Sequence, residues 1–179
     1  SRQYGPAAEY LNRAIRMQPN WAAPVTELGL LEMQAGRDLE ARDALRRSAE
    51  IDPFNNRAKN SLTLVEELLT WEIREGKHFR IRAKDEVDRA VAKDMLTVLD
   101  AIHDRVAAEF DHSPPVKTML ELMPDHQSFA VRITGMPQLH TVAAATGPLI
   151  AMEAPREGKG HNGEYDWARV IQHEYTHTV

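Results

Sequence analysis

The sequence predicts an α+β protein in which helices fill the first part of the chain and a mixed sheet with further helices follows. Three observations predict this. Residues 1–69 carry apolar and small residues at helical spacing, interrupted by prolines. From residue 70 onward, short alternating apolar segments typical of strands stand between helical segments. Residues 164–179 again show helical spacing and contain no proline or glycine. We therefore divide the chain into domains at 1–69 and 70–179.

The composition favours a soluble globular protein. Of the 179 residues, 42% are hydrophobic, which is enough for a core. The net charge of −5 and the lack of a Lys/Arg run argue against a nucleic-acid partner. The absence of cysteine excludes disulfides and thiolate metal sites. No apolar run approaches the roughly twenty residues that a membrane span needs. The sequence does not distinguish a cytoplasmic protein from an exported one.

Two prolines mark a repeat in the first domain. Pro19 and Pro53 are 34 residues apart, and each follows a predicted helix. Between them, Gly29 and Ala41 supply small side chains where two helices are expected to cross closely. The pattern resembles the tetratricopeptide (TPR) repeat, whose period is about 34 residues, and the resemblance covers about residues 3–69. A generic pair of helical hairpins is the alternative interpretation.

The TPR resemblance implies a protein partner, because such arrays present concave binding surfaces. A structural spacer is the alternative. The sequence shows one half-repeat, one full repeat and a following helix at 56–69. A stable solenoid needs about three repeats, so we expect the array to continue upstream of Ser1. We also expect its last helix to dock on the second domain.

The second domain is predicted to mix strands and helices. A β-hairpin is predicted around Gly76-Lys77, and Asp85 is predicted to cap a long helix that ends before Pro114. Strands are predicted at 116–123, 141–145 and 149–153, with a short helix at 125–134. The long helix is expected to bury this stripe: Val87, Val91, Met95, Val98, Ile102, Val106 and Phe110. Its charged residues, Asp88 among them, are expected to face solvent.

The segment from His173 to His177 reads H-E-x-x-H and carries the chemistry. Positions four apart lie one turn above each other on a helix, so these two imidazoles can converge on one ion. Glu174 is rotated away from the ligand pair, where its carboxylate can act as a general base toward a metal-bound water. The motif therefore predicts zinc, two histidine ligands and one catalytic glutamate. A buried helix with two satisfied histidines is the alternative.

The motif supplies only two ligands, whereas catalytic zinc normally takes three protein ligands and one water. Because His177 stands two residues before the end of the sequence, we expect the third ligand to lie downstream in a longer protein. We expect the isolated chain to be mostly metal-free and inactive. His140 and His161 are the less favoured upstream alternatives for a third ligand or a cleft residue.

The order of elements, ending in this motif, resembles the first half of a gluzincin peptidase domain. The resemblance is to the peptidase MA-like family and covers about residues 76–179. It implies a zincin-like domain that hydrolyses peptides or proteins, with His173 and His177 as zinc ligands and Glu174 as the base. In that family the third zinc ligand is a Glu on a later helix. An inactive TPR adaptor with a degenerate peptidase-like domain is the alternative, and a purely structural metal site is a weaker one.

The same resemblance implies an edge strand beside the cleft that pairs with extended substrate. The segment 149–153 is our candidate for it. Glu153 could then bind a substrate amine, but we favour an ordinary exposed strand residue, since lone acids usually are exposed.

Overall fold

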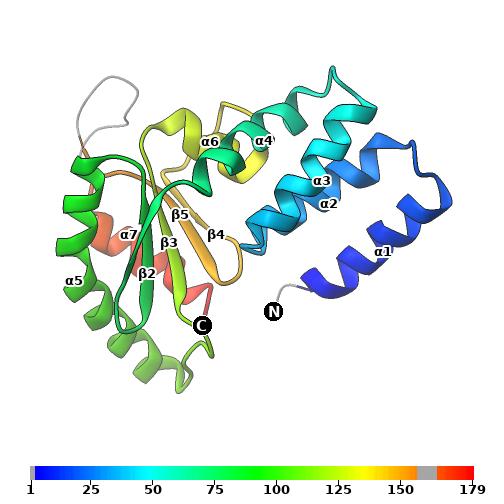
Figure 1. The fold of residues 1–179 in the computed structure, drawn as a ribbon. Coiled ribbons are helices and arrows are strands. Elements are labelled where there is room, and N and C mark those ends of the chain that lie inside the picture. Colours follow the sequence, from blue (N-terminus) through cyan, green and yellow to red (C-terminus); the bar gives the residue numbers. More distant parts are fainter. Residues whose placement is uncertain (1–2, 157–164) are drawn as a thin grey trace.

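The computed structural model describes residues 3–156 and 165–179 and confirms the predicted α+β class (Figure 1). The helices are α1 (Tyr4–Met17), α2 (Ala22–Gln34), α3 (Asp38–Ile51), α4 (Asn56–Leu68), α5 (Glu86–Phe110), α6 (His126–Thr134) and α7 (Trp167–Thr176). The strands are β1 (Glu72–Glu75), β2 (Phe79–Ala83), β3 (Thr118–Met123), β4 (Ala143–Ala145) and β5 (Leu149–Glu153). None of the helices in this described part combines the length and apolar character that crossing a membrane requires.

The first four helices form successive hairpins, as the repeat pattern predicts (Figure 1). The chain turns around Pro19, at Gly36 and around Pro53. Helices α2 and α3 cross closely at Gly29, because a Cβ added there would lie 2.6 Å from Cγ of Leu45. The predicted close crossing is therefore confirmed at Gly29. Membership of the TPR class stays a prediction.

The five strands form one mixed sheet in the order β1-β2-β3-β5-β4. Strands β2, β3 and β5 are parallel, and β1 and β4 pair antiparallel at the two edges. The predicted hairpin around Gly76-Lys77 is confirmed as β1 and β2. Helix α5 connects β2 to β3, as a parallel pair requires a long crossover.

The sheet buries both faces, because successive side chains of a strand point to opposite sides. On β5, Ile150 and Met152 belong to the core beneath α5 and α7. Leu149 and Ala151 belong to a second core, shared with α2, α3, α4 and α6. Figure 1 shows α5 and α7 on one side of the sheet and α4 and α6 on the other. Helices α2, α3 and α4 therefore share a core with the sheet.

Polar contacts at helix ends support this packing. Arg57 on α4 donates from Nε to the carbonyl of Thr134 at 2.9 Å, and Asn60 donates to the carbonyl of Gly135 at 3.3 Å. Tyr4 on α1 donates its hydroxyl to the carbonyl of Thr146 at 2.9 Å. The expected docking of the last N-terminal helix on the second domain is confirmed.

The buried stripe of α5 differs from the predicted one. Met95, Ile102 and Val106 are buried as expected, but Val87, Val98 and Phe110 are exposed. In their place the helix buries Asp88, Ala92, Leu99 and His103. The predicted positions are mostly four residues apart, whereas the helix has 3.6 residues per turn. Successive predicted positions therefore rotate away from the side of the helix that contacts the sheet. The expectation that Asp88 faces solvent was wrong, because Asp88 lies beneath Arg156 near the helix N-terminus.

A buried charge network connects the helices to the sheet. Glu121 on β3 is fully buried and accepts hydrogen bonds from Arg132 on α6, at 2.5 Å, and from Arg82 on β2. Arg82 also pairs with Asp38 at the start of α3, at 2.7 Å. Arg132 donates in addition to the carbonyl of Met33 on α2 at 2.8 Å. Four separate elements therefore converge on one carboxylate and its partners.

The network keeps Glu121 ionised. Burial alone raises the pKa of this carboxyl, but the charges and hydrogen bonds of Arg132 and Arg82 outweigh burial, so the pKa is lower than usual. Removing one partner from such a group leaves a buried charge without compensation, which is far more costly than loss of an exposed pair.

We predict that Glu121→Gln lowers the free energy of unfolding by about 3–5 kcal/mol, because two buried guanidinium groups lose their shared counter-ion. Glu66→Gln is the matched control, since Glu66 pairs with Arg46 on the surface. It should cost less than about 1 kcal/mol. Urea denaturation followed by circular dichroism measures both, and similar losses in the two variants would contradict the prediction.

Candidate metal centre

Helix α7 begins at a capped turn and carries the predicted motif. The Asp166 side chain accepts a hydrogen bond from the backbone N–H of Arg169 at 3.0 Å and so caps the helix. Ile171 and Tyr175 are buried against the sheet. With these positions facing inward, His173 and His177 are exposed and Glu174 is half-buried. The motif therefore lies on a helix, as predicted, and presents its histidines outward.

The two imidazoles meet in a geometry that suits one metal ion. Their Nε2 atoms are 3.4 Å apart, and their ring centroids are 5.0 Å apart at an interplanar angle of 87°. Two zinc–nitrogen bonds of about 2.0–2.1 Å at a tetrahedral angle place the nitrogens about 3.3–3.4 Å apart. The distance between the Nε2 atoms of His173 and His177 therefore matches that of two zinc ligands.

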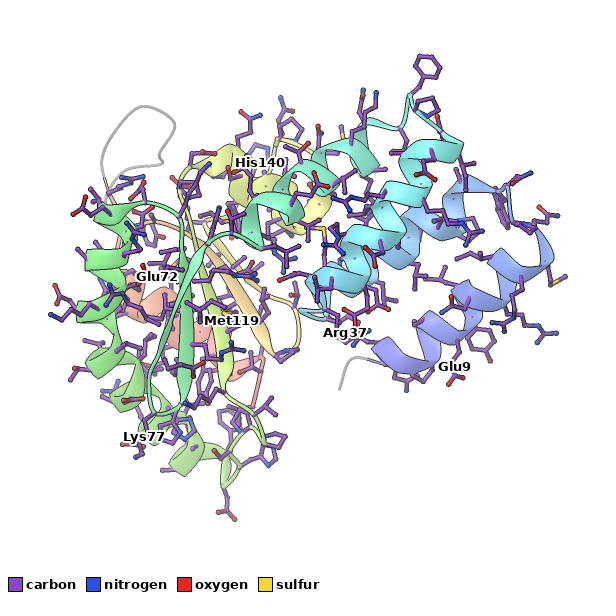
Figure 2. The ribbon with its side chains drawn as sticks, in the orientation of Figure 1. Glu9, Arg37, Glu72, Lys77, Met119 and His140 are labelled. Atoms are coloured by element: carbon purple, nitrogen blue, oxygen red, sulfur yellow. The ribbon has the colours of Figure 1, made fainter. Side chains whose placement is uncertain are left out.

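A third ligand does not join this pair among the residues that the structure describes. In that part of the chain, no third His, Asp or Glu atom lies within 4.8 Å of both imidazoles. Figure 2 places exposed His140 beside α6, away from the C-terminal end of α7. His161 lies outside the described residues. The expected ligand pair is therefore brought together, and the third ligand stays a prediction.

Glu174 faces a cleft beside the edge of the sheet. The cleft has a volume of about 760 Å³ and is lined by Glu174, His177, His112, Gly147 and the three alanines of β4. The backbone N–H of Ala145 donates to Oε2 of Glu174 at 2.8 Å. The glutamate of the motif is thus held at the level of the edge strand.

Strand β4 presents backbone groups to this cleft. Thr146 donates to the carbonyl of Leu149 and Glu153 donates to that of Val142, so positions 142, 144 and 146 face β5. In an antiparallel pair the alternate residues, here Ala143 and Ala145, turn their backbone groups outward. In the free protein, Thr141 donates to the carbonyl of Ala143 and Glu174 accepts from Ala145.

The prediction that 149–153 forms the edge strand was wrong. That segment is β5, which lies between β3 and β4 and is buried along its whole length. A nearly continuous apolar run is typical of a buried parallel strand, and this signal should have excluded an edge position. The edge strand is β4, whose three alanines carry little strand signal of their own.

Glu153 was expected to be an exposed strand residue, which was also wrong. Its side chain is 1% exposed and accepts from Nδ1 of His126 at 2.9 Å. Nε2 of His126 donates to the carbonyl of Leu139 at 2.7 Å. With an acceptor at each ring nitrogen, His126 is held as a doubly protonated imidazolium. Burial lowers the pKa of His126, but the bonds to Glu153 and Leu139 outweigh it, and the pKa is raised.

His103 was given no role from sequence, yet it anchors the motif helix. Its Nδ1 lies 2.6 Å from the hydroxyl of Tyr175, inside the motif. Burial raises the pKa of Tyr175 to about 12, so the phenol donates and His103 accepts. Burial, and next the charge of His78, lower the pKa of His103, which suits the neutral acceptor form. Spacing in the sequence gives no signal for this contact, which joins residues 72 positions apart.

His78, His103 and Asp104 also come together, but their geometry does not suit an ion. The two imidazoles stack face to face, with centroids 3.5 Å apart and an interplanar angle of 8°. Ring nitrogens bind metals in the plane of the ring, so two parallel stacked rings cannot both direct a lone pair at one ion. The cluster supports α5 and α7 rather than a second metal site.

We predict a pH-dependent stability contribution from His126. Because its folded pKa lies above the ordinary 6.5, the charged pair stabilises fully below that pH and the contribution is lost as the pH rises through the folded value. His126→Gln should therefore cost about 1–3 kcal/mol of unfolding free energy near pH 6 and less near pH 9. Denaturant titrations at the two pH values measure this. A cost that does not fall between pH 6 and pH 9 would contradict the prediction.

Comparison of the chain with family models, curated proteins and solved structures found no match. The function proposed below is therefore supported by the residues and geometry of this chain alone.

Proposed function

We propose that this protein is a zinc-dependent metallopeptidase of the gluzincin type. One observation carries the proposal: the Nε2 atoms of His173 and His177 lie at the spacing of two zinc ligands, and Glu174 stands between them in the helix. Glu174 and His177 line a cleft whose wall is an edge strand, and His173 lines a separate pocket against α5. A pair of metal ligands, a carboxylate and an edge strand are what hydrolysis of an extended peptide requires.

Each residue has a definite task in this proposal. His173 and His177 hold zinc, which, when bound, supplies a Lewis acid that polarises a carbonyl and acidifies a water. Glu174 accepts a proton at its carboxylate and delivers it to the leaving amine. The outward backbone groups of Ala143 and Ala145 pair with the substrate as an added strand, in place of their contacts with Thr141 and Glu174. The third zinc ligand comes from outside the described residues.

The N-terminal helices serve, in this proposal, to bind a protein partner or to present substrate. A second candidate function, an adaptor without catalysis, is favoured by one observation. The part of the chain described here brings only two metal ligands together, whereas a catalytic zinc needs three. Measurements of zinc binding and peptide hydrolysis separate the two functions.

We predict that Glu174→Gln keeps zinc but lowers peptide hydrolysis by about 10²–10⁴-fold, the usual contribution of a general base. His173→Ala and His177→Ala should each weaken zinc binding by at least about a hundredfold. Loss of a mere supporting hydrogen bond already costs 10–100-fold. Competition with a chromophoric chelator measures the metal affinity, and a quenched peptide library measures hydrolysis.

His140→Ala is the matched control for the histidine variants, since His140 lies away from α7 (Figure 2). It should leave zinc affinity unchanged. Unchanged turnover in Glu174→Gln would refute the assignment of the base. Stoichiometric zinc without hydrolysis of any peptide would favour the adaptor, and weakened zinc binding in His140→Ala would identify an unexpected third ligand.

A further inference from the structure

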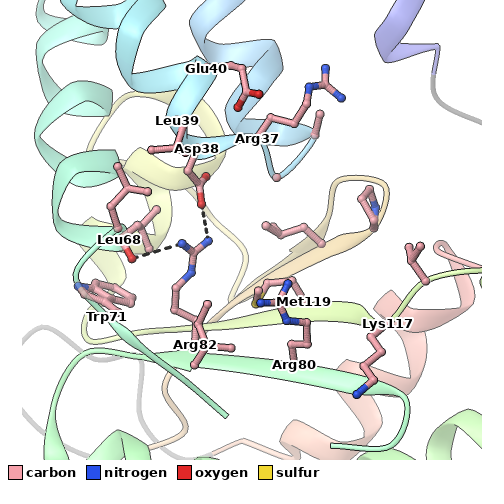
Figure 3. A pocket seen from close by; sticks show the side chains of 17 residues that line it. Arg37, Asp38, Leu39, Glu40, Leu68, Trp71, Arg80, Arg82, Lys117 and Met119 are labelled. Carbon is pink, nitrogen blue, oxygen red and sulfur yellow. Dashed lines mark hydrogen bonds and ion pairs between the residues drawn. The ribbon is translucent and has the colours of Figure 1, made fainter. Parts of the chain in front are cut away.

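A second cavity lies where the N-terminal helices meet the sheet (Figure 3). We call it the junction pocket. It has a volume of about 550 Å³, and the turn before α3 and its first residues form one wall. Residues of β2 and the start of β3 form the opposite wall, and the end of α4 with Trp71 closes one end. Its volume lies within the roughly 300–1,000 Å³ of ligand pockets.

The rim of the junction pocket is apolar. Four of its lining residues are exposed large hydrophobic side chains: Leu39, Leu69, Ile73 and Val116, with exposed fractions of 38–61%. Single exposed apolar residues are normal on a protein surface. Here four such residues surround one cavity, and an exposed apolar surface of this kind marks an interaction site.

Cations line the pocket along the sheet. Arg80 reaches Glu75 at 2.7 Å, and Lys117 reaches the same carboxylate at 3.1 Å. One carboxylate therefore serves two cations, each about 40% exposed, so this end of the pocket carries a surplus positive charge. Figure 3 shows both side chains on the same wall of the pocket. An anionic group on a ligand would complete the pairing.

Three lining residues carry buried polar atoms with unmet hydrogen-bonding capacity. Trp71 Nε1 and Arg82 Nε are donors, and Asp38 Oδ1 is an acceptor; each is buried without a hydrogen-bond partner. Such groups are rare in native proteins and point to a ligand or another partner. Donors and an acceptor together match the N–H and C=O groups of a peptide backbone.

The junction pocket and the cleft of the candidate metal centre border the same turn. Gly147 lines the cleft, and the next residue, Pro148, lines the junction pocket. A peptide that extends from β4 across this turn would reach the pocket. This arrangement favours a peptide occupant over a compact small molecule.

We propose that the junction pocket binds a peptide segment that carries a carboxylate beside a large apolar side chain. The apolar side chain lies on the rim at Leu39, Ile73 and Val116, and the carboxylate pairs with Lys117 beside Arg80. That this segment belongs to a substrate rests on the proposed peptidase function. Binding itself does not, because it needs neither zinc nor Glu174.

The test is fluorescence anisotropy with a labelled peptide, acetyl-Gly-Glu-Leu-Glu-Leu-Gly, on the whole chain with the Glu174→Gln substitution and without added metal. The same peptide with Gln in place of Glu is the matched neutral probe. The acidic peptide should bind more tightly than the neutral one. Lys117→Gln removes the surplus charge, keeps the Arg80–Glu75 pair, and should weaken acidic-peptide binding about two- to fivefold, the value of one exposed ion pair.

Two further variants complete the test. Val116→Ser should weaken both peptides, because it removes apolar rim surface. Arg46→Gln, an exposed cation that does not line the pocket, should change neither. Equal affinity for acidic and neutral peptides, or no effect of Lys117→Gln, would overturn the proposal. If the affinity differences are found but hydrolysis is absent, the pocket is a partner-binding site and the peptidase function is refuted. If hydrolysis is found without the affinity differences, the peptidase function is supported and the pocket proposal is refuted.

Discussion

The carboxylate of Glu121 is the constraint on which the rest of the structure depends. It is fully buried in the sheet and is stabilised only because Arg132 and Arg82 approach it from α6 and β2. Arg82 carries the network on to Asp38 of α3. A buried charge of this kind tolerates few arrangements, since each missing partner is costly. It therefore sets how the N-terminal helices sit on the sheet, and the junction pocket forms beside it.

The opposite face of the sheet positions the motif helix. Ile171 and Tyr175 enter the core beneath α5, and the Tyr175 hydroxyl is bound by His103. With those two positions buried, the helical turn leaves the motif histidines facing outward and Glu174 toward β4. The orientation of the motif side chains on α7 thus depends on packing on the other side of the helix, and Tyr175 has a structural role.

The two proposed binding regions lie on either side of one turn. Gly147 and Pro148 separate the cleft of the candidate metal centre from the junction pocket. Strand β4 offers backbone pairing and little side-chain bulk, which suits sequence-tolerant binding of an extended peptide. The junction pocket offers apolar surface and cations, which suits selection. A protein that combines the two regions would bind a peptide backbone at β4 and select its side chains in the junction pocket.

The sequence by itself determined the local features of this protein. Helix ends capped by Asp85, Asp125 and Asp166, the turns at the repeat prolines and the meeting of His173 with His177 all depend on residues within a few positions of each other. Only the tertiary structure decided which strand lies at the edge. It also decided that Asp88 and Glu153 are buried and that His103 and His126 have distant partners. The physical reason is that strand neighbours and buried polar partners are far apart in the chain, where local periodicity carries no information about them.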